Sequence, residues 1–180
     1  MSNQLIMGWN QLAATLLDWH TDPGNDTRRF AIFHIAIHDA LNHIKPVYHK
    51  WKKRPSITIN STLVQQEVLD AAVNAAAATT LRMAILGIED YINKLPPVLK
   101  NKYLDFNAAY CQKQIIDRFN SNMGNTTPSK SYGEALGISV AIEILALRNN
   151  DGSNTAILSP RPDEDQDGKF QSEYYNDIVP

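Results

Sequence analysis

A run of mainly apolar residues that leaves little room for a polar face lies between residues 30 and 44. Its apolar positions are Phe30, Phe33, Ile37, Leu41 and Ile44 on one stripe at helical spacing, with Ile32, Ile35 and Ala36 beside it. A helix that is apolar over most of its circumference is a buried helix. We therefore predict a helix that begins at Asp26 or Thr27, ends before Pro46 and forms the centre of the core.

Four further segments carry helical periodicity, so the predicted fold class is all-α, a helical bundle of about five helices. The other predicted helices cover residues 5–19, 61–86, 97–120 and 129–149. Six alanines between residues 71 and 78 predict tight packing against the helix over residues 30–44. Gly87 is expected to interrupt the long helix before a separate turn at 88–94. Gly133 and Gly137, four residues apart, predict a close helix contact.

The composition changes after Gly152, which divides the chain into a helical domain over residues 1–152 and an irregular, Pro/Asp-rich C-terminal tail over residues 153–180. The formal net charge is −2, so nothing global favours a nucleic-acid partner. We expect no membrane span, since no window reaches about 18 uninterrupted apolar residues. No signal peptide is evident, which leaves the location cytoplasmic or undetermined. The single cysteine, Cys111, is predicted to be a small core residue.

The most suggestive polar cluster consists of His34, His38 and Asp39. Histidines at positions i and i+4 share a helix face and can bind one zinc ion, which leaves open a metal-dependent enzyme that uses His34 and His38. A zinc protease has glutamate directly after the first histidine, where this chain has Ile35, and His43 lies at a different angle. The interpretation that we favour is a set of polar groups that bond to neighbouring helices. We therefore assign no metal ligand.

Other patterns are incomplete. Asp163, Asp165 and Asp167 begin a calcium-loop pattern, but Tyr174 stands where the final glutamate belongs, and a solvated acidic turn is the alternative. The basic run over residues 45–54 can contact phosphate or anionic lipid, although a solvated connector is the interpretation that we favour. The chain contains no Gly-x-Ser-x-Gly elbow and no Gly-x-x-x-x-Gly-Lys-Ser/Thr phosphate loop.

Several segments, taken in order, resemble a known family. They are Trp9-Asn10, the run from Arg29 to Ile44 with Tyr48 after it, an alanine-rich helix, Gly137–Ala141, Leu147–Gly152 and Gly168-Lys169-Phe170. The most specific of them are His38-Asp39-Ala40-Leu41-Asn42 and Arg148-Asn149-Asn150-Asp151-Gly152. Over nearly its whole length, the chain resembles the N-terminal half of bacterial vanadium-dependent haloperoxidase-like proteins, which are related to the type 2 phosphatidic acid phosphatases.

This resemblance implies two helical bundles, with vanadate or phosphate bound in the C-terminal bundle by Lys-x6-Arg-Pro, Pro-Ser-Gly-His and Ser-Arg-x5-His motifs. Arg161-Pro162 supplies an Arg-Pro pair, but Asn154 stands at the lysine position. The other two motifs do not occur, and no histidine follows His49. We carry over no catalytic residue and no cofactor-binding residue. The resemblance implies a structural, helix-linking role for the His-Asp signature over residues 34–39.

The leading hypothesis is a non-catalytic N-terminal helical domain that resembles these proteins and lacks their vanadate- and phosphate-binding motifs. One alternative is a stand-alone protein–protein interaction module, and another is the metal-dependent enzyme that uses His34 and His38. A bundle that normally packs against a second bundle exposes an apolar face when it is alone. We therefore predict a homodimer, or a complex with a separately encoded C-terminal half.

Overall fold

The computed structural model describes residues 3–18, 23–49 and 62–149, and this part of the chain contains no strand. Its helices are α1 (Asn3–Leu17), α2 (Pro23–Ile44), α3 (Gln65–Lys94), α4 (Pro97–Lys100), the 3-10 helix η1 (Asn101–Tyr103), α5 (Ala108–Met123) and α6 (Pro128–Asn149). Five of the α-helices have 15 or more residues, which confirms the predicted all-α bundle. The predicted tail over residues 153–180 lies outside the described residues.

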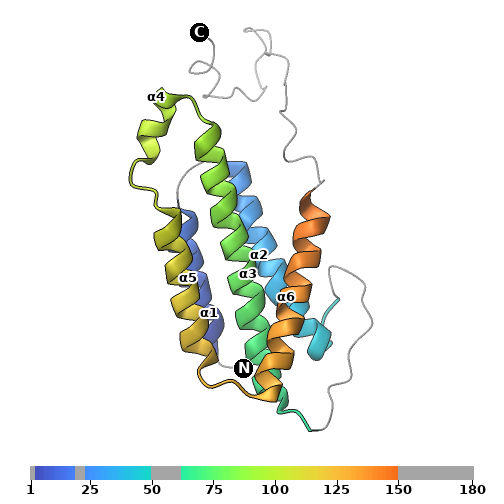
Figure 1. The fold of residues 1–180 in the computed structure, drawn as a ribbon. Helices are drawn as coiled ribbons and strands as arrows, with labels where there is room; N and C mark the ends of the chain where they lie inside the picture. The colour runs from blue at the N-terminus through green and yellow to red at the C-terminus, as the bar shows by residue number, and fades with distance from the viewer. Residues whose placement is uncertain (1–2, 19–22, 50–61, 150–180) are drawn as a thin grey trace.

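Helix α3 lies at the centre of the bundle. Figure 1 shows α1 and α5 on one side of α3 and α6 on the other, with α2 behind it, and α3 packs against all four. Two clusters of buried apolar side chains fill the space between these helices. One cluster joins α1, α2, α3 and α5 and includes Trp9 and Ile115. The second joins α2, α3 and α6 and includes Ala40 and Val140.

The prediction that the helix over residues 30–44 forms the centre of the core was wrong. Helix α2 buries Phe33 and Ile37, but it leaves Ala31 and His34 exposed. Helix α3 is instead buried at every position over residues 71–78. The difference follows from side-chain size, because the alanines of α3 let a neighbouring helix approach from each side.

Helix α6 packs on α3 through two glycines. A Cβ atom placed on Gly133 would lie 2.9 Å from the Cβ of Ala71 and closer still to a backbone carbonyl oxygen of α3. A Cβ atom on Gly137 would lie 2.9 Å from the Cβ of Ala75 and closer still to the carbonyl oxygen of Ala72. The predicted close contact at these glycines is therefore confirmed. Because both residue numbers increase together along the contact, α3 and α6 run in the same direction.

Two helices differ from their predicted bounds. Helix α2 begins at Pro23, earlier than predicted, because proline has a suitable φ for the first helical turn and its missing N–H loses no helical hydrogen bond there. Helix α3 begins at Gln65 and continues without interruption to Lys94, so the predicted break at Gly87 was wrong. Gly87 lies on the exposed surface, where it costs some helix propensity but does not end the helix.

The single helix predicted over residues 97–120 was also wrong, because the chain divides there into α4, η1 and α5. Asn107 provides the second start, since its side chain accepts a hydrogen bond from the backbone N–H of Tyr110 at 2.9 Å. Asparagine at this position satisfies one of the free amide groups of a helix start. Apolar periodicity continues across the break, and this continuity hid it in the sequence.

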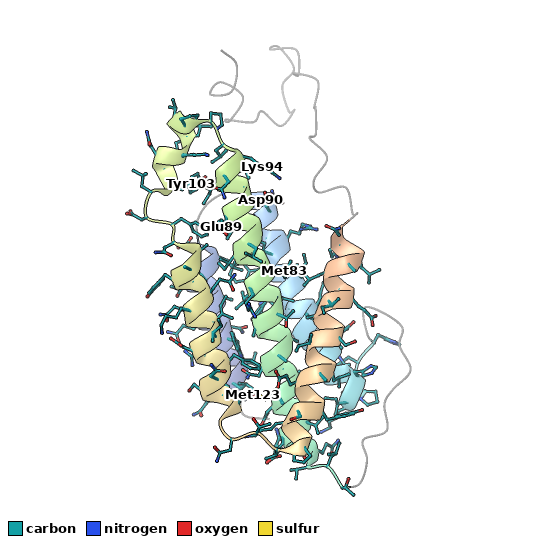
Figure 2. The ribbon with its side chains drawn as sticks, viewed as in Figure 1. Met83, Glu89, Asp90, Lys94, Tyr103 and Met123 are labelled. Atoms are coloured by element: carbon teal, nitrogen blue, oxygen red, sulfur yellow. The ribbon has the colours of Figure 1, made fainter. Side chains whose placement is uncertain are left out.

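The turn between α3 and α5 is held against the end of α3. The rings of Tyr91 and Tyr103 meet edge to face, with 6.4 Å between their centroids. Figure 2 shows Asp90 and Lys94 near the same end of α3, where the Lys94 ammonium donates to the Asp90 carboxylate at 2.6 Å. The ion pair is exposed on both sides and contributes little, whereas the aromatic contact fixes the direction of the turn.

Among the described helices, α3 alone is long and apolar enough to cross a membrane by length and composition. In its most apolar window, 67% of the residues are buried inside the bundle. The core helix of a helical bundle passes the same test, because it too is apolar on every side. The packing of α1, α2, α5 and α6 around α3 accounts for its composition.

Candidate functional site

The candidate polar cluster lies at the C-terminal end of α2. Asn42 is 3% exposed there, and its Oδ1 accepts hydrogen bonds from the backbone N–H groups of Val47 at 3.2 Å and Tyr48 at 2.9 Å. Both bonds cross from the last turn of α2 to the residues that follow the helix. Asn42 therefore anchors the first part of the connector against α2.

His38 lies one turn before Asn42, and its two ring nitrogens have different partners. Its Nε2 lies 2.9 Å from Asn42 Nδ2, and its Nδ1 lies 3.1 Å from Oδ1 of Asp39. Because two N–H groups already donate to the Asn42 oxygen, the Asn42 Nδ2 is the donor toward His38, and Nε2 is the acceptor. In the neutral imidazole the proton is then on Nδ1, which donates to the Asp39 carboxylate.

This arrangement differs from a catalytic histidine–aspartate pair. In such a pair the carboxylate holds Nδ1–H while Nε2 faces the reacting group. The side chain of His38 is 43% exposed, but its Nε2 lone pair is already occupied by Asn42. The geometry therefore favours a structural role for His38. For His38 itself, the described bonds stay within α2 and do not reach a neighbouring helix, in contrast to the prediction.

His34 lies one turn before His38 on α2. It is exposed, and its ring packs edge-on against Phe33 with 5.0 Å between centroids. Partial burial lowers the pKa of His34 below its ordinary value, so the neutral imidazole that a metal requires is favoured. No group of three histidine, cysteine or acidic residues within 3–18, 23–49 and 62–149 is placed to hold a metal ion. The hypothesis of a metal-dependent enzyme stays a prediction, and metal analysis of the purified protein tests it.

Other residues singled out in the sequence have a simpler placement. Cys111 is 2% exposed, as predicted for a core residue, and burial raises the pKa of its thiol, which disfavours the reactive thiolate. The calcium-loop pattern that begins at Asp163 and the Arg161-Pro162 pair lie outside the described residues, as do four of the five lysine and arginine residues in the basic run over residues 45–54. Lys45 of that run is exposed.

Of the two most specific parts of the family resemblance, the first lies on α2, and Arg148 and Asn149 of the second lie at the end of α6, whereas its residues 150–152 lie outside the described residues. Helices α2 and α6 are in contact. The guanidinium group of Arg28 donates to the backbone carbonyl oxygen of Arg148 in the last turn of α6. Carbonyl groups in the last turn of a helix have no partner inside the helix, so this bond caps α6. Arg29 pairs instead with Asp26 at 2.6 Å, within the first turns of α2.

A second buried polar network was not predicted from the sequence. It is centred on Asn74 of α3, which is 1% exposed. Asn74 Oδ1 accepts from the indole Nε1 of Trp9 at 3.0 Å and from Nδ2 of Asn122 at 2.9 Å, while its Nδ2 donates to the carbonyl oxygen of Phe119 at 2.9 Å. The network joins α1, α3 and α5. Its one signal in the sequence was an asparagine inside an alanine-rich helix.

No family model, curated protein or solved structure matches this chain. The resemblance to haloperoxidase-like proteins therefore depends on the order and spacing of the motif residues alone.

The hydrogen bonds of Asn42 predict a measurable tautomer for His38. Long-range proton–nitrogen NMR spectra of the neutral form of His38 should show its proton on Nδ1, because Nε2 accepts from Asn42. In Asn42→Ala the share of this tautomer should fall, since one of the two bonds that select it is removed and only the bond to Asp39 remains. His34 is the internal control and should be unchanged by this substitution. A proton on Nε2 of His38 in the unsubstituted protein would contradict the assignment.

Proposed function

We propose that this chain is a non-catalytic N-terminal helical domain of a vanadium-dependent haloperoxidase-like protein, related to the type 2 phosphatidic acid phosphatases. The observation that carries the proposal is the occupied Nε2 of His38, which turns the most specific motif into an anchor for the connector. The bond from Arg28 to Arg148 supports it further, because it joins the two helices that carry the resemblance.

In this proposal the domain supplies a rigid surface and no reacting group. Oxyanion binding in the family requires several cationic side chains and a histidine. The sequence of this chain lacks two of the three motifs that provide them and has Asn154 at the lysine position of the third. Vanadate or phosphate would therefore be held by residues of a second bundle, encoded outside these 180 residues. The domain's contribution would be to pack against that bundle.

An activity assay tests this proposal. Purified protein, with vanadate, hydrogen peroxide and bromide or with p-nitrophenyl phosphate, should give no turnover above buffer. Turnover that copurifies with the protein and is lost in His38→Ala would overturn the proposal. Sequencing of the DNA beyond the codon for Pro180 is the complementary test, since a nearby reading frame should encode the missing anion-binding motifs.

A stand-alone interaction module is the second candidate function. The observation that favours it is the outward side of α6, where Ile138 and Ile142 are exposed without a charged residue between them. If no frame near this one encodes an anion site, the module becomes the better interpretation.

A further inference from the structure

Helix α6 has an uncharged side that faces away from the bundle. Its buried side packs on α3 and α2 and consists of Gly133, Leu136, Gly137, Val140, Ala141 and Ile144. The opposite side, at helical spacing, consists of Ser131, Ala135, Ile138, Ser139, Ile142, Ala146 and Asn149. We call this set the outer stripe of α6. Surface helices ordinarily carry charged residues on their outward side, so the outer stripe has the composition of a covered surface.

The exposure of the outer stripe is substantial at its centre. The side chain of Ile142 is 54% exposed and that of Ile138 is 37% exposed. Leu145 lies at the edge of the stripe and is partly buried against the cluster between α2 and α6. Figure 1 shows α6 at the side of the bundle opposite α1 and α5, where none of the other described helices covers it from outside.

We propose that a second copy of this chain covers the outer stripe. The two α6 helices are antiparallel, and the twofold axis crosses them at the level of residue 140. The apolar positions 135, 138, 142 and 145 are separated by three, four and three residues, so their pattern is the same when it is read backwards. In this register Ile138 packs against Ile142 of the second copy, and Ala135 packs against Leu145 of the second copy. A twofold interface needs this kind of self-complementary surface.

Charge complementarity supports the same register. Glu134 lies at one end of the stripe, and an antiparallel partner would place Arg148 of the second copy beside it, twice in each dimer. At the outermost layer Ser131 would face Asn149 of the second copy, so that polar residues close both ends. A parallel pair would instead place both Glu134 residues at one end of the interface and both Arg148 residues at the other end, so the opposite charges would not meet. The sequence therefore favours the antiparallel arrangement over the parallel one.

Sedimentation equilibrium over about 1–100 µM should show a monomer–dimer equilibrium for the unsubstituted chain. Ile142→Glu should weaken the dimer at least tenfold, because it places a charge opposite Ile138 of the second copy. Because Ile142 is exposed in the monomer, the substitution should leave the fold intact, which circular dichroism checks. Val98→Glu is the matched control, since Val98 on α4 is 78% exposed and lies outside the stripe, and this variant should dimerise normally.

A charge exchange tests the register. Glu134→Arg should weaken the dimer, and the combination with Arg148→Glu should restore it. Spin labels supply the geometry, in a Cys111→Ala background. Labels at Ser139→Cys should lie within about 15 Å of each other across the axis, whereas labels at Ser131→Cys should be about 30 Å apart, from a rise of 1.5 Å per residue.

Three outcomes would overturn this proposal. The first is a monomer at 100 µM, which would leave the outer stripe to residues 153–180 or to a different protein. The second is a dimer that Ile142→Glu does not weaken, and the third is equal label distances at both sites, which indicate a parallel pair. The proposed function would survive each of these outcomes. A dimer with the expected register would likewise survive the discovery of enzymatic activity, so the two proposals fail independently.

Discussion

Gly137→Ala is expected to lower the free energy of unfolding by about 2–3 kcal/mol, the upper part of the range of about 1–3 kcal/mol for an overpacked core. The added methyl group would lie 2.9 Å from the Cβ of Ala75 and closer still to the carbonyl oxygen of Ala72. Neither atom can rotate away, because one belongs to the backbone of α3 and the other is attached directly to it. Helix α6 must therefore move outward, which separates apolar surfaces along the whole contact. Urea denaturation followed by circular dichroism measures the loss.

Gly87→Ala is the matched control, because it makes the same chemical change at a helical position where the added methyl group meets no other atom. A Cβ atom on Gly87 would have no neighbour within 4 Å. Alanine also has the higher helix propensity, so this variant should be more stable than the parent by about 0.5–1 kcal/mol. The two substitutions should thus have opposite signs. A Gly137→Ala variant as stable as Gly87→Ala would show that α3 and α6 are not in close contact.

The two glycines of α6 also show how much of the fold can be predicted from the sequence. The spacing of Gly133 and Gly137 predicts a close contact, since few other reasons explain two glycines one turn apart within an apolar helix. It does not identify the partner helix. The partner of these glycines is the helix whose facing side chains are also small. That helix is α3, and its alanines are in the centre because α3 packs against four other helices. The centre of the core was therefore misplaced to α2.

Local hydrogen bonds limited the prediction in a different way. Asn107 starts α5 inside a run of continuous helical periodicity, and a cap of this kind depends on the backbone conformation of one residue. The same limit applies to the candidate site. The sequence singles out His38 and Asp39, but the residue that determines their role is Asn42, through bonds to backbone groups beyond the helix. Side-chain types alone do not reveal which backbone groups lie nearby.

Asn74→Leu is expected to lower the free energy of unfolding by about 3 kcal/mol, because it removes hydrogen bonds from the buried indole of Trp9 and from the half-buried carbonyl group of Phe119. Leucine is similar in size to asparagine and prefers a helix, so neither volume nor propensity explains a loss. The indole N–H of Trp9, which is 0% exposed, and the carbonyl oxygen of Phe119 would both lose the described partner. A buried donor or acceptor without a partner costs about 1–3 kcal/mol.

Two further variants separate the network from the general cost of changing a core residue. Asn122→Ala removes only the exposed donor to Asn74, so its effect should be below about 1 kcal/mol. Trp9→Phe removes the buried donor. Its combination with Asn74→Leu should cost less than the sum of the two single changes, because either change alone already breaks the hydrogen bond between Trp9 and Asn74. Additive effects would mean that Trp9 and Asn74 stabilise the protein separately. Coupling would instead place the link between α1 and α3 in the hydrogen bond itself, at the one polar position in the buried middle of α3 over residues 71–78.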